Sequence, residues 1–303
     1  SVIAMGVLNL MPWAGPTMRA ATVLGIEAGS LWQTILPIQA CGIVLALAVA
    51  VLNGIIEQKR GAGLNGKLAQ EATHLNSVEE AAAEAESANN ELARPKLFVF
   101  NIILTIAVIA LLIKDIFPSY VPFMIGVAIA ILVNYPGAKM QKKIINLHSG
   151  PALMMCSTLM GAAVLMGILV KDIEGVNSVI TCMSNLISSI LPAALGQHLP
   201  LVIGILSVPL ALAFDTDSYF YGMLPVMIGI GEGFGVGAMP IAVAMVVCRN
   251  CATFISPMVP ATLLGVGLAD VDIKDHIKFS FLWVWGFSII CMLIGAIVGI
   301  IPL

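Results

Sequence analysis

The sequence predicts an all-α membrane protein, a helical bundle with broken transmembrane helices and a re-entrant hairpin. Two observations support this fold class. Of the 303 residues, 59% are hydrophobic and only 10% are charged, whereas soluble domains contain about 25% charged residues. Two apolar segments are also interrupted in the same way, by Asn-Leu-Met-Pro-Trp-Ala-Gly-Pro at residues 9–16 and by Asn-Cys-Ala-Thr-Phe-Ile-Ser-Pro at residues 250–257.

These interruptions have a physical meaning inside a bilayer. Proline removes a backbone donor, and Gly or Ser beside it loosens the turn, so main-chain polar groups lose their helical partners. Lipid tolerates such groups only where they are buried in protein or line a cavity. A pair of broken helices is therefore typical of a transporter whose binding site lies at the membrane midplane. The chain is predicted to be half of an inverted-repeat transporter together with the end of its first repeat.

The predicted elements follow in order along the chain. Residues 1–56 are expected to form the end of the first repeat, a broken helix followed by one spanning helix. Residues 57–97 become charged and rich in Ala and Glu, which indicates a solvated cytoplasmic linker. Residues 98–303 would form the second repeat, which opens with three apolar spans at 98–113, 118–136 and 150–170.

The pattern changes in the middle of the second repeat. Polar residues oppose an apolar stripe over 175–196, which is typical of an amphipathic helix at the membrane interface. The two apolar pieces within 199–231 are each about 20 Å long, too short to cross about 30 Å of hydrocarbon, so they predict a re-entrant hairpin. The second broken helix is expected over 233–268 and the last span over 279–303.

The distribution of charge supports this topology and excludes other functions. Ten of the fourteen Lys and Arg residues fall on one face, in the stretches 57–97, 138–149 and 270–278. The positive-inside rule assigns that face to the cytoplasm, so we expect a multi-pass protein of the cytoplasmic membrane. The chain has no basic patch for nucleic acid and no H-E-x-x-H or G-x-S-x-G motif, so neither nucleic-acid binding nor enzymatic activity is expected.

The tip of the hairpin carries the clearest chemical signal, Asp-Thr-Asp-Ser at residues 215–218. A carboxylate at membrane depth costs about 2.5–3.5 kcal/mol, so two within three residues indicate a site for a hard cation, a proton or a metal-bound anion. The alternative is that the aspartates cap the second half-helix, and both roles are compatible.

The two breaks add further candidate ligands. Their amides and hydroxyls can bind a solute or form ordinary interhelical hydrogen bonds, and their arginines can pair with a carboxylate or extend to the interface. The full set of candidate substrate-binding residues is Asp215, Thr216, Asp217, Ser218, Asn9, Gly15, Arg19, Arg249, Asn250, Thr253 and Ser256.

Three segments, 9–17, 214–225 and 250–257, resemble the CitMHS family of citrate–divalent metal–proton symporters within the ion transporter superfamily. The resemblance implies symport of citrate complexed with a divalent cation of the Mg²⁺ or Ca²⁺ type, coupled to protons, with no permanently bound cofactor. It also implies a homodimer with an elevator-like mechanism, in which the hairpin tip and the breaks line the site. Asp215 and Asp217 would meet the metal, directly or only through citrate. Because the family has another hairpin before the first break, we expect this chain to be the C-terminal part of a longer protein.

The charges near the breaks agree with such a ligand. Citrate carries three negative charges, and a bound divalent cation leaves only one. Arg19 and Arg249 are the basic residues beside the breaks, and a carrier of bare tricarboxylate would be expected to show more. A dicarboxylate, gluconate or arsenite carrier of the same superfamily, and an inactive or partner-dependent fragment, are the alternatives.

Overall fold

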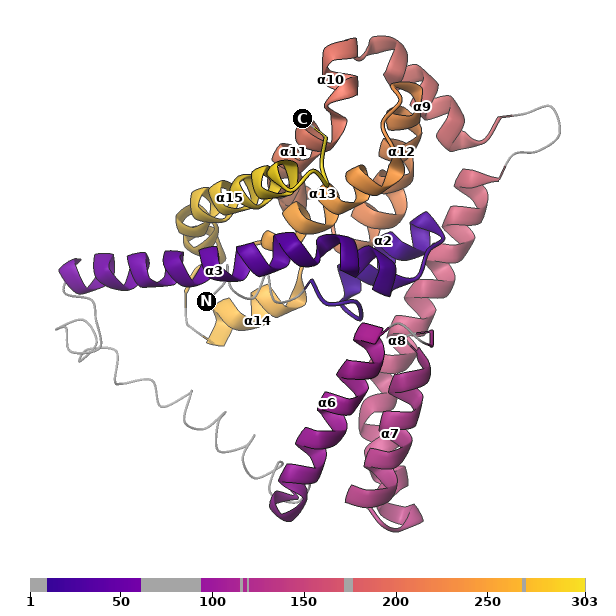
Figure 1. The fold of residues 1–303 in the computed structure, drawn as a ribbon, viewed down its shortest axis with the longest axis vertical. Coiled ribbons are helices and arrows are strands. Elements are labelled where there is room, and N and C mark those ends of the chain that lie inside the picture. Colours follow the sequence, from indigo (N-terminus) through magenta and orange to yellow (C-terminus); the bar gives the residue numbers. More distant parts are fainter. Residues whose placement is uncertain are drawn as a thin grey trace. The chain divides into compact units, whose positions relative to one another are not determined.

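The computed structural model of the chain describes residues 10–60, 94–114, 117–118, 120–171, 177–268 and 271–302. All regular secondary structure in these residues is helical, which confirms the predicted all-α class (Figure 1). The chain forms two compact units, which are described separately. The first unit combines Ser1–Ala46 with Ser149–Leu303, and the second is Leu47–His148.

Helix α13 (Ala238–Cys251) lies at the centre of the first unit. Four helices pack against it: α2 (Gly15–Leu24), α11 (Leu199–Ala213), α12 (Leu224–Gly233) and α15 (Ile273–Ile297). Every residue of α13 from Ile241 onward is buried. This stretch is apolar on all its faces, as expected of a helix surrounded by others, up to Arg249 and Asn250 in its last turn.

The segment predicted as a re-entrant hairpin consists of two short helices joined at a polar tip. Helix α11 ends at Ala213, and a π-helical turn, η3 (Ser218–Met223), leads into α12. Helix α9 (Val179–Ile190), within the predicted amphipathic segment, packs against α12, and the short α10 (Ala193–Gln197) follows it. Ser184 of α9 donates a hydrogen bond to the Val226 carbonyl at 3.3 Å, and a Cβ at Gly229 would overlap its hydroxyl, so the two helices are in close contact there.

In the described residues, each proline-containing segment includes a stretch that is not regular helix. The first forms a turn before α2, which begins at Gly15 and ends at Gly25 with φ 66°. In the second, α13 stops at Cys251 and α14 (Pro260–Leu268) begins after an eight-residue connection. The Phe254 carbonyl, freed by this interruption, lies 3.0 Å from Nε2 of His276 on α15. Main-chain polarity at the second break is thus partly satisfied from a neighbouring helix.

The second unit contains α6 (Phe98–Lys114), which follows the short η2 (Pro95–Leu97), and α7 (Tyr120–Asn134). These two helices pack side by side, and a Cβ at Gly126 would overlap the Val108 side chain at their closest approach. Two longer helices belong to both units: α3 (Ala28–Arg60) and α8 (Ala138–Val170).

Three described segments are long and apolar enough to cross a membrane: Ala28–Ile56, Pro95–Leu112 and Ile273–Ile297. Two helices begin earlier than the sequence pattern predicted. Helix α8 includes the polar stretch before residue 150, because Lys and Gln are good helix formers. Helix α15 starts at Ile273 rather than at 279, because Asp272 caps it by accepting a hydrogen bond from the Lys274 amide at 2.8 Å.

Candidate functional site

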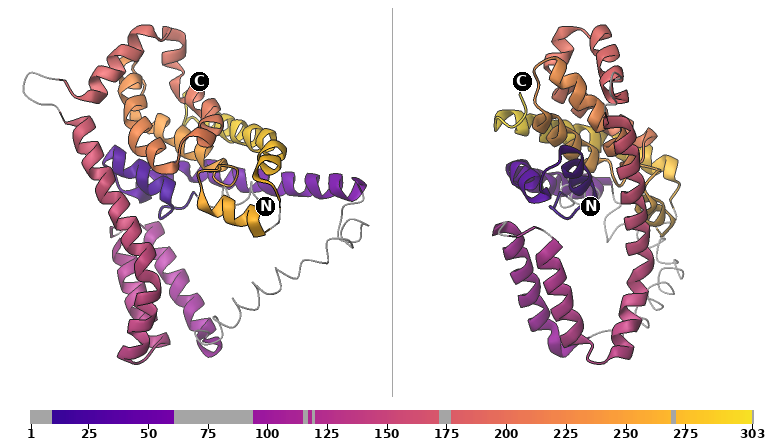
Figure 2. Two further views of the ribbon diagram at one scale, coloured as in Figure 1. Left: turned by 180° about the vertical axis from the view of Figure 1, so that it is seen from behind. Right: turned by 90° about the vertical axis from the view of Figure 1, so that its right-hand side faces the viewer.

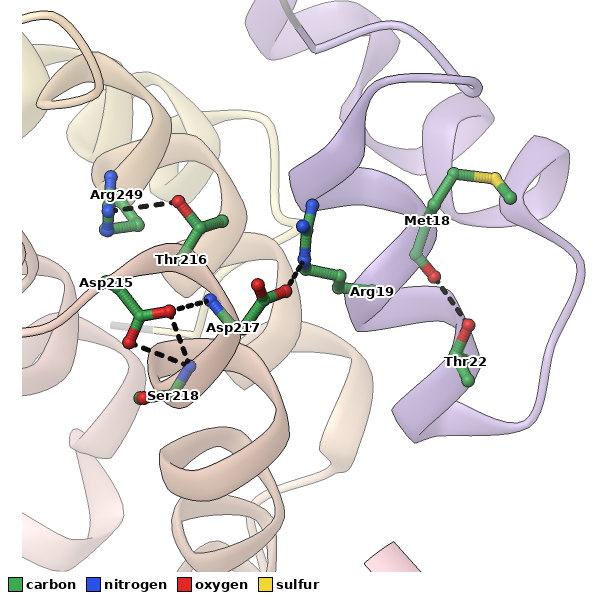
Figure 3. A network of polar contacts seen from close by, with 8 residues as sticks. All are labelled: Met18, Arg19, Thr22, Asp215, Thr216, Asp217, Ser218 and Arg249. Atoms are coloured by element: carbon green, nitrogen blue, oxygen red, sulfur yellow. Dashed lines mark hydrogen bonds and ion pairs between the residues drawn. The ribbon is translucent and has the colours of Figure 1, made fainter. Parts of the chain in front are cut away.

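The polar tip between α11 and η3 gives its two aspartates different roles. The Asp215 carboxylate accepts hydrogen bonds from the backbone amides of Asp217 at 3.0 Å and of Ser218 at 3.3 Å (Figure 3). Asp215 therefore caps the helical turn that follows it, so the capping alternative holds for this residue. Asp217 has its backbone in this turn, but its side chain points away from it.

An ion pair joins Asp217 to the other end of the sequence. Nε of Arg19, on α2, donates to Oδ1 of Asp217. The Arg19 side chain is 17% exposed and the Asp217 side chain is 36% exposed, so the pair is accessible but partly shielded from solvent. Gly15 makes room for it, because a Cβ at this first residue of α2 would overlap Nη1 of Arg19. Side chains four residues apart on a helix lie on the same face, which explains this proximity.

A second arginine approaches the tip from α13. Arg249 is 1% exposed, its Nη2 donates to the Thr216 hydroxyl at 3.3 Å, and its guanidinium lies 5.8 Å from the centre of the Tyr219 ring. Asp215 is within electrostatic range, but within the described part of the chain no carboxylate forms an ion pair with Arg249. A buried cation without a direct counterion is costly, so this arginine is well prepared for an anionic ligand.

Three buried polar atoms in this region have no hydrogen-bond partner among the described residues. They are Nε of Arg249, the hydroxyl of Tyr221 and the hydroxyl of Thr17. Tyr221, on η3, is 2% exposed and lies within electrostatic range of Arg19 and Asp217, and Thr17 belongs to the first turn of α2. Buried polar groups are nearly always paired, so unpaired ones beside two arginines indicate a place for a ligand.

The residues of the second break bond mainly to the protein. Asn250 and Ser256 are fully buried. The Thr253 hydroxyl donates to the Asn250 side chain at 3.2 Å, and the Ser256 hydroxyl donates to the Ala211 carbonyl of α11 at 2.6 Å. Ser256 thus ties the break to the first half of the hairpin. The matching residue of the first break, Asn9, lies outside the described residues.

The structure thus gathers part of the predicted set and adds to it. Gly15, Arg19, Thr216, Asp217 and Arg249 meet between α2, the hairpin tip and α13, whereas Thr253 and Ser256 act in holding the second break together. Thr17, Tyr219 and Tyr221 were not predicted as site residues. The sequence nevertheless pointed to them, since all three belong to two of the three segments that carry the family resemblance, in Pro-Thr after the first break and in Ser-Tyr-Phe-Tyr after the tip.

The chemistry of this cluster suits a ligand that carries both signs of charge. Two arginines can bind carboxylates with paired N–H groups, and two aspartates supply the oxygen ligands that hard cations prefer. Helix α2 begins without a side-chain cap at Gly15, beside the Arg19 guanidinium, so the partial positive charge of a helix N-terminus adds to that of the arginine. Among the residues described here, no group of three or more His, Cys, Asp or Glu could hold a metal. A metal ion at the tip would need most of its ligands from another molecule.

Three proteins of Bacillus subtilis (strain 168) are similar to this chain over nearly its whole length. It is 33% identical to a "Citrate transporter" over 301 residues, which is 99% of this chain. It is 36% identical over 299 residues to a "Mg(2+)/citrate complex secondary transporter", and 30% identical over 297 residues to the "Uncharacterized transporter YraO", covering 97% and 98% of this chain. The chain spans 66% of the length of each relative. No protein-family model matches the chain, and no solved structure matches it.

Proposed function

The chain belongs to the CitMHS family of citrate transporters, and we propose that the protein carries citrate complexed with a divalent metal ion across the cytoplasmic membrane together with protons. Its relatives are named as transporters, in agreement with the expectation that it is not an enzyme. The apolar helices agree with a membrane protein. A homodimeric, elevator-like carrier, as the family resemblance implies, is part of this proposal.

The Arg19–Asp217 ion pair is the observation that carries the proposal. It joins α2, which follows the first break, to the hairpin tip. Its arginine suits the carboxylates of a metal–citrate complex, and its aspartate suits the metal ion. When the complex enters, the metal ion takes the place of the guanidinium on Asp217, and a citrate carboxylate takes the place of Asp217 on Arg19. Each protein charge exchanges one partner for another, so neither is left uncompensated.

This exchange explains why the two components would travel together. Free citrate can pair with Arg19, but the Asp217 carboxylate then lies beside a polyanion. A free divalent cation can pair with Asp217, but the Arg19 guanidinium then lies beside a dication. Either case places like charges close together at reduced dielectric, which is strongly unfavourable. Arg249 would then bind a second carboxylate deeper in the site through its unpaired Nε, and the Tyr221 and Thr17 hydroxyls would bind the remaining oxygens of citrate.

Charge balance gives protons a role. The cluster contains two arginines and two aspartates, so it is neutral when all four are ionised, and the metal–citrate complex adds one negative charge. Moving an uncompensated charge through the bilayer is costly, and one bound proton removes that charge. The aspartates of the tip and the citrate carboxylates are the groups available to hold it.

The test is uptake of labelled citrate into proteoliposomes that contain the purified protein, over a panel of divalent cations and with an imposed pH gradient. We expect uptake only when a divalent cation is present, and faster uptake when the outside is more acidic. Equal uptake in the presence of excess chelator, or uptake driven by a sodium gradient instead of a proton gradient, would overturn the proposal.

A further inference from the structure

The second unit contains a cleft that the proposed transport does not use. It is lined by residues of the helix pair α6–α7 (Figure 2) and by Ile144 and His148 of α8, and has a volume of about 600 Å³. One part of its lining is polar, with Arg94, Asn101 and Asn134, which are linked by hydrogen bonds, and His148 also lines the cleft. The rest is largely apolar, with side chains such as Leu104 and Ile131.

The polar part of the cleft is built rather than incidental. Nε of Arg94 donates to the Asn134 carbonyl at 3.0 Å, and the guanidinium lies 4.9 Å from the centre of the Tyr135 ring. The side-chain amides of Asn101 and Asn134 exchange two hydrogen bonds of 2.9 and 2.8 Å, which tie the start of α6 to the end of α7. These contacts hold the positive charge of Arg94 in the wall of the cleft.

Basic residues occur at the ends of the helices that line the cleft. Arg94 and Lys96 precede α6, and Lys139, Lys142 and Lys143 lie in the first two turns of α8. Residues 94–148 contain a single acidic residue, which follows α6 at its far end. Clusters of basic residues beside apolar helices attract the anionic headgroups of the cytoplasmic leaflet.

The apolar side of the cleft continues onto exposed apolar side chains of α6 and α7. Val127, which lines it, is 54% exposed, and Ile103, Ile106 and Leu132 on the same two helices are 61%, 61% and 65% exposed. An inorganic anion would use only the polar part of such a cleft, whereas a molecule with a charged head and an apolar tail matches both parts.

We propose that this cleft binds an anionic phospholipid, with its phosphate at Arg94 and His148 and one acyl chain along Leu104, Val127 and Ile131. None of these residues belongs to the cluster of Arg19, Asp217 and Arg249, and the proposal does not depend on the transported substrate. The Asn101–Asn134 amide pair holds together α6 and α7, which supply most of the lining of the site.

The experiment is native mass spectrometry of the purified protein in detergent, titrated with phosphatidylglycerol, with phosphatidylcholine of the same acyl chains, or with inorganic phosphate. Arg94→Gln keeps a polar side chain but removes the charge, and Lys278→Gln, at an exposed position of α15, is the matched control. We expect Arg94→Gln to weaken phosphatidylglycerol retention about fivefold, the effect of one basic residue at an anionic surface, and the control to leave it unchanged. Ala130→Phe, which fills the apolar wall without changing charge, should also displace the lipid.

Three results would overturn the proposal. The first is equal retention of phosphatidylcholine and phosphatidylglycerol, which would make the cleft an ordinary part of the lipid-facing surface. The second is full competition by inorganic phosphate, since the acyl chain would then contribute nothing. The third is a change of oligomeric state in Ala130→Phe with lipid retention intact, which would show that a second copy of the chain occupies the cleft. A thermal unfolding curve of each variant verifies that a loss of lipid does not come from misfolding.

Discussion

Replacing Arg19 with glutamine is expected to let a free divalent cation bind at the hairpin tip in the absence of citrate. In the unaltered protein the guanidinium holds the Asp217 carboxylate, and a cation has to displace it. The substitution removes this competitor while the carboxylate stays in place. The reciprocal change, Asp217→Asn, removes the carboxylate and is expected to let citrate bind without metal.

The size of the effect follows from the exposure of the pair. With 17% and 36% of their side-chain surface accessible, Arg19 and Asp217 form a pair close to the upper end of the range for exposed ion pairs, about 1 kcal/mol. Losing the competitor should therefore tighten Mg²⁺ binding about fivefold. The same change removes a charge-assisted hydrogen bond to citrate, worth about 1.5–3 kcal/mol, so the affinity for the metal–citrate complex should fall, by about tenfold net.

Isothermal titration calorimetry of the purified protein with MgCl₂, with citrate and with their mixture measures all three affinities. Lys278→Gln, which removes an exposed cation from α15, serves as the control and should behave like the unaltered protein. If Arg19→Gln binds the complex with unchanged affinity and gains no affinity for Mg²⁺ alone, the ion pair takes no part in binding and the exchange of partners described above is wrong.

Four further substitutions test single positions, and the first two form a matched pair. Tyr221→Phe should leave the melting temperature unchanged, because its hydroxyl has no partner in the described residues, yet raise the KM for citrate uptake about tenfold. Tyr219→Phe should instead lower the melting temperature, because its hydroxyl bonds to a serine at 2.6 Å. Gly15→Ala should raise the KM by displacing the neighbouring guanidinium, whereas Gly267→Ala, with open space around it, should not. Ser256→Ala should destabilise the protein by about 1–3 kcal/mol, because it leaves a carbonyl of α11 without its 2.6 Å hydrogen bond.

Each of these predictions has a clear contrary result. Equal losses of stability in Tyr221→Phe and Tyr219→Phe would show that the first hydroxyl has a structural partner. Uptake by Gly15→Ala at the unaltered KM would mean that the guanidinium position is not critical. An unchanged thermal unfolding curve for Ser256→Ala would show that the hydrogen bond between the second break and α11 does not stabilise the protein.

Features that depend on neighbouring residues in the chain were predictable. Proline with glycine or serine inside apolar sequence has few structural outcomes, so the turn before Gly15 and the non-helical stretch around Ser256 follow from backbone chemistry. The short apolar pieces on either side of Asp215 likewise predict two half-length helices joined by a polar tip. The start of α15 lies earlier than the apolar pattern predicts, because Asp272 caps the helix within the polar stretch.

Features that depend on distant residues were not predictable. Nothing local to Arg19 or Asp217 shows that they meet, since 198 residues separate them. The hydroxyls of Thr17 and Tyr221 could not be identified as unpaired either, because that property depends on every neighbour in the folded protein. The sequence offered both aspartates of the tip as equal candidates, and only the folded backbone shows that Asp215 caps a turn while Asp217 forms the ion pair.

The equal numbers of arginines and aspartates in the cluster determine how the proposed carrier would respond to membrane voltage. An empty site that holds no net charge returns across the bilayer without electrical work, so the potential can act only on the loaded step. That step is neutral if one proton accompanies each complex, and electrogenic if more do, with about 2.3 kcal/mol per additional charge for every 100 mV. The current recorded per citrate transported would then count the coupled protons beyond the first.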